Sequence, residues 1–281
     1  MLEAIFLIIL GLVWIVFGVV QDLKKREIAN WLNFSLVIFA LTFRFFYSLF
    51  NNQGYGFFYY GLIGFAFFFV IGNLFYYGKV FAGGDAKLMI ALGAVIPFSE
   101  SLFANFNLVL TFFVFFLVAG AFYGVIFSLV LGIKNRKIFV KEFSKKFKEK
   151  KNIFSVALFL SLLLIVVSFL FSTLFFIAIF VFIFPYIYLS AKSIDESCMI
   201  KRVNTKSLNE GDWLYKDLKI GKKTIRARWE GLDNEEINFL KKKKKNILIR
   251  QGIPFSPVFL ISYLILIYML LIQKIYLFKV F

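Results

Sequence analysis

Residues 2–20 read LEAIFLIILGLVWIVFGVV, an almost unbroken run of apolar side chains. A helix of roughly 20 such residues is long enough to cross the hydrocarbon core of a bilayer. Similar runs recur along the 281-residue chain, which is 61% hydrophobic and has a mean hydropathy of +0.83. Soluble domains are only about half apolar. The chain is therefore expected to be an all-α polytopic membrane protein.

The apolar runs predict about eight membrane segments. The run 153–191 is about twice as long as one span, and we expect a hairpin that turns near 171–173; the alternative is one long tilted helix. The run 87–98 is too short to cross alone, so it must begin or end inside protein. The expected segments are Leu2–Val20, Trp31–Phe50, Phe57–Tyr77, Lys87–Phe98, Leu108–Ile133, two within Ile153–Ala191, and Ser256–Phe278.

The segments between the runs define the expected domains. Membrane helices fill 1–133, a basic loop 134–152, the hairpin 153–191, a small α+β domain 192–252 and a last membrane helix 253–281. In the small domain, Leu218–Ile220 and Thr224–Arg228 flank a Gly turn and predict a β-hairpin. Asp233 and Glu236 have the spacing of a capping box that opens a helix. The Lys241–Lys245 run falls at the end of that helix, where we expect it to lie beside anionic lipid headgroups.

The charge distribution predicts the orientation. The chain carries 33 Lys and Arg against 16 Asp and Glu, a net charge of +17. The basic residues gather at 24–26 and 134–151, whereas 51–56 and 99–107 hold none. Basic loops stay in the cytoplasm, so the N-terminus is expected outside. Nucleic acid is not an expected partner, because no aromatic-basic RNA-binding motif accompanies the basic loops.

Two absences limit the possible chemistry. The chain has no histidine, which excludes Ser-His, Cys-His and His-ligated metal mechanisms. It has one cysteine, Cys198, so neither an intrachain disulfide nor a CxxC zinc site can form. Catalysis must come from carboxylates, Lys, Tyr, Ser or the backbone, and we expect no metal and no organic cofactor.

Two aspartates are the candidate catalytic residues. Asp22 follows the first expected span by two residues, and Asp85 precedes the short fourth segment. The ends of the first and third spans lie on the same side of the membrane, so the two carboxyls can meet at one depth. Two carboxyls in close contact share one proton. The ionised member can then take a proton from water while the other donates to a peptide carbonyl oxygen.

Gly83 and Gly84, directly before Asp85, let the backbone turn sharply and approach a substrate peptide closely. Simpler explanations exist for each aspartate alone. Asp22 can be an interfacial acid that pairs with Lys25 or Arg26, and Gly-Gly-Asp can be a turn with a helix cap. The joint topology of the two residues, in a chain without histidine, favours catalysis.

At this point the sequence resembles a known family. Residues 20–28, VQDLKKREI, followed by Asn30-Trp31, resemble the first aspartate motif of the archaeal preflagellin and prepilin peptidases. Residues 83–94, GGDAKLMIALGA, are similar to their second, the GxGD motif of intramembrane aspartyl peptidases. Residues 253–257, IPFSP, resemble the entry to the family's C-terminal helix. The fold that the resemblance implies is the family's six-helix core, to which this chain adds the 153–191 hairpin.

The resemblance implies a membrane endopeptidase that removes class III signal peptides from type IV pilin-like or archaellin precursors at the cytoplasmic face. Asp22 and Asp85 match the catalytic pair, and Lys87 matches a recurrent motif position without an assigned role. Glu27 and the Asp195-Glu196 pair are candidate contacts for the basic leader of the substrate, although ordinary interfacial charge explains them too. Ala82 departs from the motif, because it stands where the first glycine of GxGD is expected.

Three other functions are compatible with the composition. A transporter or channel with an acidic coupling site requires acids near the bilayer centre, whereas these acids lie at one interface. A non-catalytic membrane subunit of a pilus machine does not depend on either aspartate. A Ser-Lys peptidase is the least favoured, because no serine lies close to Lys87 in the sequence.

Overall fold

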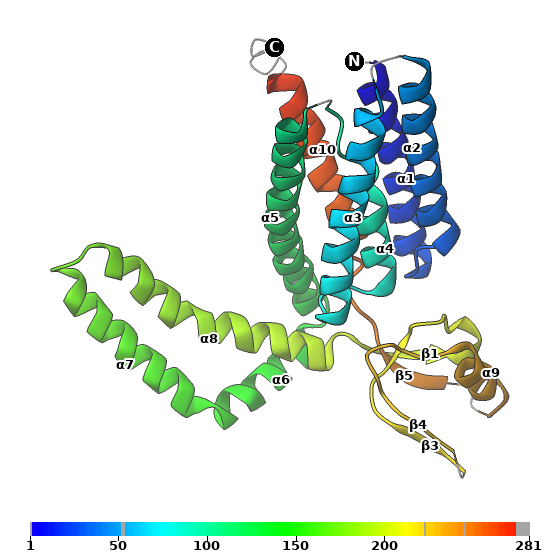
Figure 1. Cartoon of the computed structure of the whole chain (residues 1–281). Helices are drawn as coiled ribbons and strands as arrows, with labels where there is room; N and C mark the ends of the chain where they lie inside the picture. Colours follow the sequence, from blue (N-terminus) through cyan, green and yellow to red (C-terminus); the bar gives the residue numbers. More distant parts are fainter. Residues whose placement is uncertain (1, 52–53, 100, 222, 244–245, 274–281) are drawn as a thin grey trace. The chain divides into compact units, whose positions relative to one another are not determined.

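The computed structural model of the chain describes residues 2–51, 54–99, 101–221, 223–243 and 246–273 (Figure 1). It divides into two compact units, one formed by 1–124 and 253–281 and the other by 125–252. Six described helices are long and apolar enough to cross a membrane. They are α1 (Leu2–Lys25), α2 (Asn30–Phe50), α3 (Gly56–Tyr77), α5 (Leu102–Lys134), α7 (Lys151–Ser168) and α8 (Thr173–Ser197). The protein is therefore a multi-pass, predominantly helical membrane protein, as the sequence predicts.

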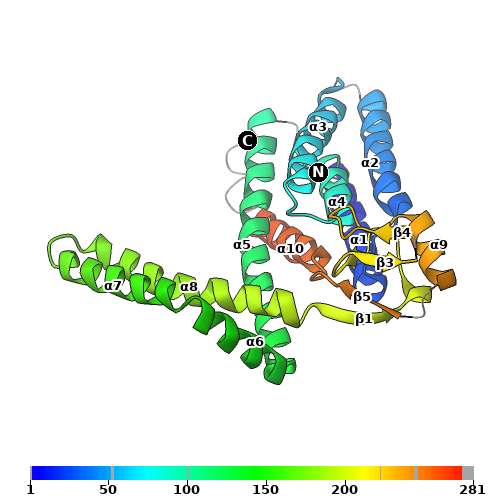
Figure 2. The ribbon, with the colours of Figure 1, turned by 90° about the horizontal axis from the view of Figure 1, so that it is seen from below.

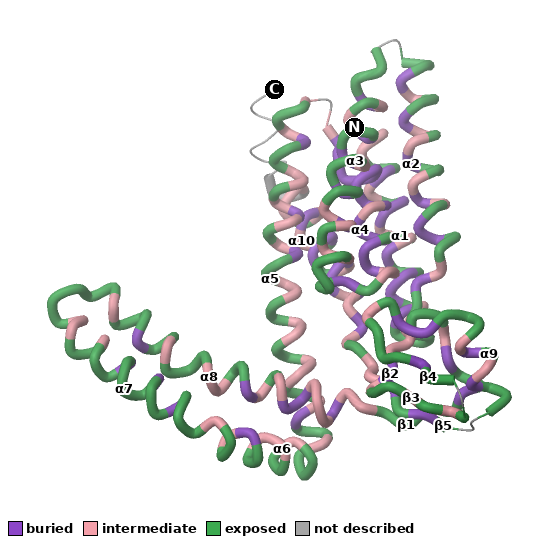
Figure 3. The backbone as a smooth tube through the Cα atoms, turned by 60° about the horizontal axis from the view of Figure 1, so that its bottom comes forward, coloured by how far each residue is buried: buried purple, intermediate pink, exposed green. Residues whose placement is uncertain are grey.

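The first unit is a helical bundle around a short helix, α4 (Gly83–Gly93). Helix α4 contacts α1, α2 and α3, while α10 (Ser256–Gln273) packs along α1 (Figure 2). Residues 88, 89 and 91–96, in and just after α4, are fully or almost fully buried. Figure 3 shows that buried residues concentrate in this unit where α1, α4 and α10 meet. A helix too short to cross a bilayer is thus enclosed by protein.

Glycines allow the close packing of α3 against α4. A Cβ atom on Gly64 would lie 2.4 Å from the backbone oxygen of Gly93, and one on Gly93 would lie 2.5 Å from that of Gly64. A Cβ on Gly72 would lie 2.7 Å from the side-chain Cγ1 of Ile90 and 3.0 Å from the backbone oxygen of Ala86. Apolar attraction between helices is weak in lipid, so small residues that bring backbones together are the usual means of association.

Arg44 of α2 closes the C-terminal end of α4. Its side chain is completely buried and donates hydrogen bonds to the carbonyl oxygens of Ala94, Val95 and Pro97, at 2.9, 3.1 and 2.5 Å. A fourth bond, of 2.9 Å, goes to the carbonyl of Phe57, whose ring lies 4.4 Å from the guanidinium carbon. The first three of these carbonyls follow Gly93, the last residue of α4, where the helical hydrogen-bond pattern has ended. Arg44 therefore donates hydrogen bonds to backbone carbonyls for which the surrounding lipid has no donor.

Several helix boundaries differ from those expected. Helix α1 runs on to Lys25, so Asp22 lies inside it. Helix α4 begins at Gly83 and ends at Gly93, whereas the sequence predicted 87–98. The glycines thus open a helix that we expected to begin after them. Helix α10 begins at Ser256 as expected, and its expected end at Phe278 lies outside the described residues.

The second unit contains the predicted helical hairpin. Helices α7 and α8 pack against each other, and the chain turns between Ser168 and Thr173. The expectation of two helices rather than one tilted helix is confirmed. The basic segment expected to be a loop is instead mostly α6 (Arg136–Glu149), which packs on α8. Its Lys146 forms ion pairs with Glu142 and Glu196.

The small α+β domain lies between α8 and residue 252. Strands β1 (Ile200–Asn204), β5 (Asn246–Arg250) and β2 (Trp213–Leu214) form an antiparallel sheet in that order, which the sequence did not reveal. The expected hairpin forms from β3 (Leu218–Ile220) and β4 (Lys223–Ile225). Helix α9 (Asn234–Lys243) begins with the expected capping box, in which Glu236 N–H donates to Asp233 Oδ1 at 2.7 Å and Asp233 N–H to Glu236 Oε2 at 3.2 Å. Lys244 and Lys245 lie outside the described residues.

Candidate functional site

Asp22 lies three residues before the end of α1 and only 8% of its surface is exposed. Its Oδ2 accepts a hydrogen bond of 3.2 Å from the backbone N–H of Ser256, the first residue of α10. The N-terminus of a helix carries a partial positive charge and unpaired N–H groups. Helix α10 therefore provides a favourable site for a negative charge on Asp22.

Asp85 occupies the third position of α4, and it is also 8% exposed. Ala82 is the N-cap residue of this helix, and the Asp85 carboxyl forms a hydrogen bond with the Ala82 backbone. An acid at this position can reach back to the N-cap in this way. Asp85, like Asp22, thus lies at the positive end of a short helix.

The two aspartates, 63 positions apart in sequence (85 − 22), are brought together in the same unit. Their carboxyls are close enough for the charge of Asp22 to act on Asp85. Two contacts join the surrounding motifs. A Cβ on Gly84 would lie 3.4 Å from the Cβ of Ile28, and the Lys87 ammonium donates a 2.7 Å hydrogen bond to Asn30 Oδ1. The turn after Asp22 therefore packs directly on the first turns of α4, which hold Asp85.

The local backbone explains why Ala82 can replace a glycine. Ala82 has φ −69° and ψ 160°, an extended conformation open to any residue, and it is exposed. Neither steric crowding nor a left-handed backbone demands a glycine there. The methyl group of Ala82 is thus accommodated without strain. Gly83 and Gly84 are both half-buried and lie in the first turn of α4.

The other candidate residues are exposed or have partners of their own. Glu27 is exposed in the turn between α1 and α2. Asp195 and Glu196, in the second unit, form ion pairs with Arg250 and with Lys146 and Lys192. Lys87 is exposed on α4 and bonded to Asn30 rather than to a carboxylate. The structure thus gives a partner to Lys87, whose role the sequence left open.

Two residues near Asp22 were not singled out from the sequence. The charges of Asp22 and Arg26 act on Tyr123 of α5, which is partly buried. The hydroxyl oxygen of Ser256 is fully buried and has no hydrogen-bond partner among the described residues. Tyr123 belongs to an apolar span that looks like any other in sequence, whereas Ser256 falls within the IPFSP motif and could have been considered from it.

The chemistry available at this site is that of two carboxyls. Among the described residues, no group of three or more His, Cys, Asp or Glu side chains is arranged to hold a metal ion. One ionised and one protonated carboxyl can act as general base and general acid. Burial strengthens their mutual repulsion, because the protein interior screens charge less than water does.

Comparison with known proteins agrees with this arrangement. Residues 9–131 match the type IV leader peptidase family. The chain is 29% identical, over 134 residues, to a preflagellin peptidase of Methanococcus maripaludis. That alignment covers 45% of this chain and 57% of the relative, so the chain spans little more than half of the relative's length. No solved structure matches the chain. Residues 9–131, which hold both aspartates, are therefore similar to the type IV leader peptidase family.

Proposed function

We propose that the protein is an aspartic endopeptidase that removes the signal peptide from pilin-like or archaellin precursors, with Asp22 and Asp85 as its catalytic pair. The observation that carries the proposal is the coupling of these two buried carboxyls at the ends of two helices. The match of residues 9–131 to the type IV leader peptidase family supports it independently.

The proposed reaction follows aspartic-protease chemistry. One carboxylate takes a proton from a water molecule, whose oxygen forms a bond to the carbon of the scissile peptide. The protonated carboxyl donates to the carbonyl oxygen at the same time. The tetrahedral intermediate then expels the amine, which receives a proton as the C–N bond breaks. Either carboxyl can hold the proton in this scheme, so neither is assigned as the base.

The proposed place of cleavage is the cytoplasmic face. Asp22 precedes Lys24, Lys25 and Arg26, and basic residues that follow a span stay in the cytoplasm. A precursor with a polar leader and an apolar helix has its junction at that interface. The 153–191 hairpin is an addition to the six-helix core, and we infer from it a subgroup whose substrate is a pilin rather than an archaellin.

Co-expression with candidate precursors tests the proposal. Asp22→Asn and Asp85→Asn keep the shape and the acceptor oxygen of each side chain but remove its acid-base function. We expect each variant to remain folded and inserted while leader removal falls by at least about 100-fold, the lower end of what general acid-base groups contribute. The matched control is Glu149→Gln, an exposed acid of α6, which should cleave normally.

The alternatives give different results. Cleavage that persists in either aspartate variant would end the proposal of a catalytic pair. Ion or solute flux in proteoliposomes without any precursor supports a transporter. Assembly of pili that is unaffected by both substitutions supports a non-catalytic subunit.

A further inference from the structure

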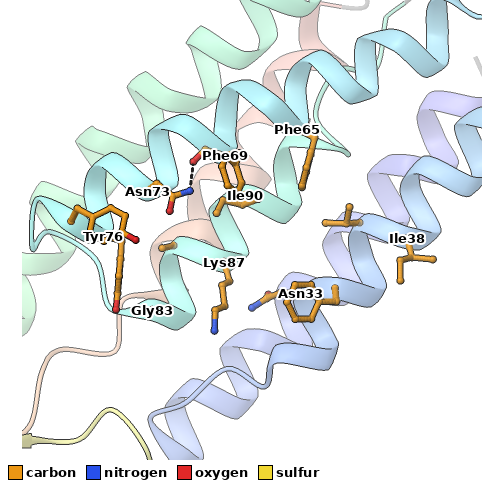
Figure 4. A pocket seen from close by; sticks show the side chains of 13 residues that line it. Asn33, Ile38, Phe65, Phe69, Asn73, Tyr76, Gly83, Lys87 and Ile90 are labelled. Atoms are coloured by element: carbon orange, nitrogen blue, oxygen red, sulfur yellow. Dashed lines mark hydrogen bonds between the residues drawn. The ribbon is translucent and has the colours of Figure 1, made fainter. Parts of the chain in front are cut away.

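A groove of about 580 Å³ lies between α2, α3 and α4 (Figure 4). This volume is within the range of roughly 300–1,000 Å³ that is usual for small-molecule sites. All of its lining residues belong to the first unit. Two of its walls are candidate membrane spans, so its contents are drawn from a lipid environment.

The groove lies behind the catalytic helix rather than at the aspartates. Gly83, Lys87 and Ile90 line it, at a spacing that places them on one face of α4. Asp85 is two positions after Gly83, which turns it roughly 200° away around the helix. Neither aspartate is among the lining residues. A peptide bound along this groove would therefore face away from the carboxyl pair.

The residues that line the groove are polar at one end of it and apolar at the other, on all three helices. Along α2 the lining residues run from Asn33 to Val37 and Ile38, and along α3 from Asn73 to Phe69 and Phe65. Helices α2 and α3 are joined by a short connection and run in opposite directions, so the polar residues of both lie at the same end. On α4, Lys87 lies at that end and Ile90 beyond it. The groove suits a molecule with a polar head and an apolar tail.

Asn33 is a buried amide without a partner. It is 3% exposed, and neither its oxygen nor its nitrogen has a hydrogen-bond partner among the described residues. An unsatisfied buried polar group costs about 1–3 kcal/mol. Figure 4 shows Asn33 of α2 and Lys87 of α4 bordering the same space. A polar ligand group that reaches the Asn33 amide would remove this cost.

Lys87 favours a ligand with a negative charge. It is the single charged residue among those that line the groove. Its ammonium has three donors, and one of them is used by the bond to Asn30. The remaining donors, on an exposed side chain, are suited to phosphate oxygens. The ligand is therefore expected to be an anion.

We propose that the groove binds one anionic phospholipid of the surrounding bilayer. Its phosphate lies at Lys87, its glycerol region at Asn33, and an acyl chain along the apolar wall beyond them. Asn33 is about 4.5 Å deeper than Asn30, because three residues of helix rise about 1.5 Å each. This difference in depth matches the step from the phosphate to the glycerol region of a lipid. A bound lipid supports the back of α4, on the side opposite Asp85.

Lipid binding to the full-length protein tests this without any peptidase assay. The protein is stripped of lipid in a neutral detergent, and bound phosphatidylglycerol and phosphatidylcholine are counted by native mass spectrometry. We expect one phosphatidylglycerol to bind in preference to phosphatidylcholine. Lys87→Gln should lower its affinity about fivefold, because one basic residue near a lipid headgroup contributes about 1 kcal/mol. Lys24→Gln, an exposed lysine outside the groove, should leave it unchanged.

A second pair of variants tests the location. Val37→Trp fills the apolar end and should remove the bound lipid while leaving Lys87 in place. A photo-crosslinking amino acid at Ile38 should label the lipid. Equal binding of both lipids, or unchanged binding in Lys87→Gln or Val37→Trp, contradicts the proposal. So does crosslinking of Ile38 to a precursor helix, because the occupant would then be the substrate. Failure of leader cleavage would refute the proposed function and leave this result untouched.

Discussion

Replacing Arg44 by methionine removes the side chain that holds the C-terminal end of α4. Methionine fills similar apolar space but donates no hydrogen bond. The change leaves four backbone carbonyls without their donor: those of Phe57, Ala94, Val95 and Pro97. They lie in a region where Arg44 itself is completely buried, so water does not replace the lost donors.

The magnitude follows from two opposing effects. Each orphaned carbonyl costs about 2 kcal/mol, so the four together cost about 8 kcal/mol. Removing a buried charge recovers its desolvation penalty, several kcal/mol and about 4 here. The difference is a destabilisation of about 4 kcal/mol, or roughly a thousandfold in the folding equilibrium. Arg44→Lys keeps the charge but has three donors in place of five, and we expect about half of the loss.

Denaturant unfolding of the purified protein in detergent micelles measures this difference. Gly61→Ala offers an independent check, because its Cβ would lie 2.4 Å from Cδ of Arg44 and must displace the guanidinium without removing it. We expect Gly61→Ala to lose stability as well. If Arg44→Met stays within about 1 kcal/mol of the wild type, the carbonyls are satisfied in another way and this account of α4 is refuted.

Two further predictions concern the first turn of α4 and the small domain. Gly84→Ala should fold normally, because its Cβ meets Ile28 at ordinary distances of 3.4–3.6 Å. We expect it to cleave precursors more slowly, because the added methyl group fills the contact between α4 and the turn after Asp22, on which the approach of the two aspartates depends. Cleavage at the wild-type rate would show that this contact does not affect the reaction. The backbone N–H of Glu236 and the charge of Arg228 lower the pKa of Asp233 in the folded protein. The ionised carboxylate therefore stabilises α9 fully at any pH above the ordinary pKa of an aspartate, about 4. This stabilisation is lost as the pH falls through the lower pKa that Asp233 has in the folded protein. Hydrogen exchange in α9 of the full chain, corrected for intrinsic rates, should therefore accelerate below that pH in the wild type, whereas Asp233→Ala should exchange fast throughout.

Much of the bundle could be predicted from hydrophobic length alone. The apolar run 153–191 is about twice as long as one membrane span and contains no charged residue, so the sequence predicts a helical hairpin. Helices α7 and α8 form this hairpin. The sequence alone could place Asp22 and Asp85 on the same side of the membrane, because the ends of the first and third spans are two membrane crossings apart. Their assignment as the catalytic pair stays a prediction.

The helix ends were harder to predict, because side chains far along the chain determine them. Helix α4 ends at Gly93, although residues 94–98 are as apolar as those before them, and Arg44 and Gly64 determine where it can stop. Asp22 lies within α1 because the helix continues through Lys24 and Lys25, whose charges favour a helix C-terminus. The hydropathy pattern of the sequence does not indicate any of these contacts.

The small domain shows the same division between local and distant signals. The capping box of α9 and the hairpin of β3 and β4 depend on neighbours in sequence, and both were predicted. The sheet pairs β1 with β5, so that Ile200 faces Arg250 across 50 positions of sequence (250 − 200). No pattern within either short strand identifies the other as its partner.

The C-terminal end of α4 is more deeply buried than its N-terminal end, and this has a mechanical consequence. Gly93 is held by the backbone of α3 and the carbonyls beyond it by Arg44, while Asp85 lies eight residues away (93 − 85) at the other end. At about 1.5 Å per residue that arm is roughly 12 Å long. Pivoting the helix by about 10° about its fixed end swings Asp85 through roughly 2 Å, close to the difference between a hydrogen bond and a gap. Small rigid-body movements of one short helix are thus enough to join or part the two carboxyls.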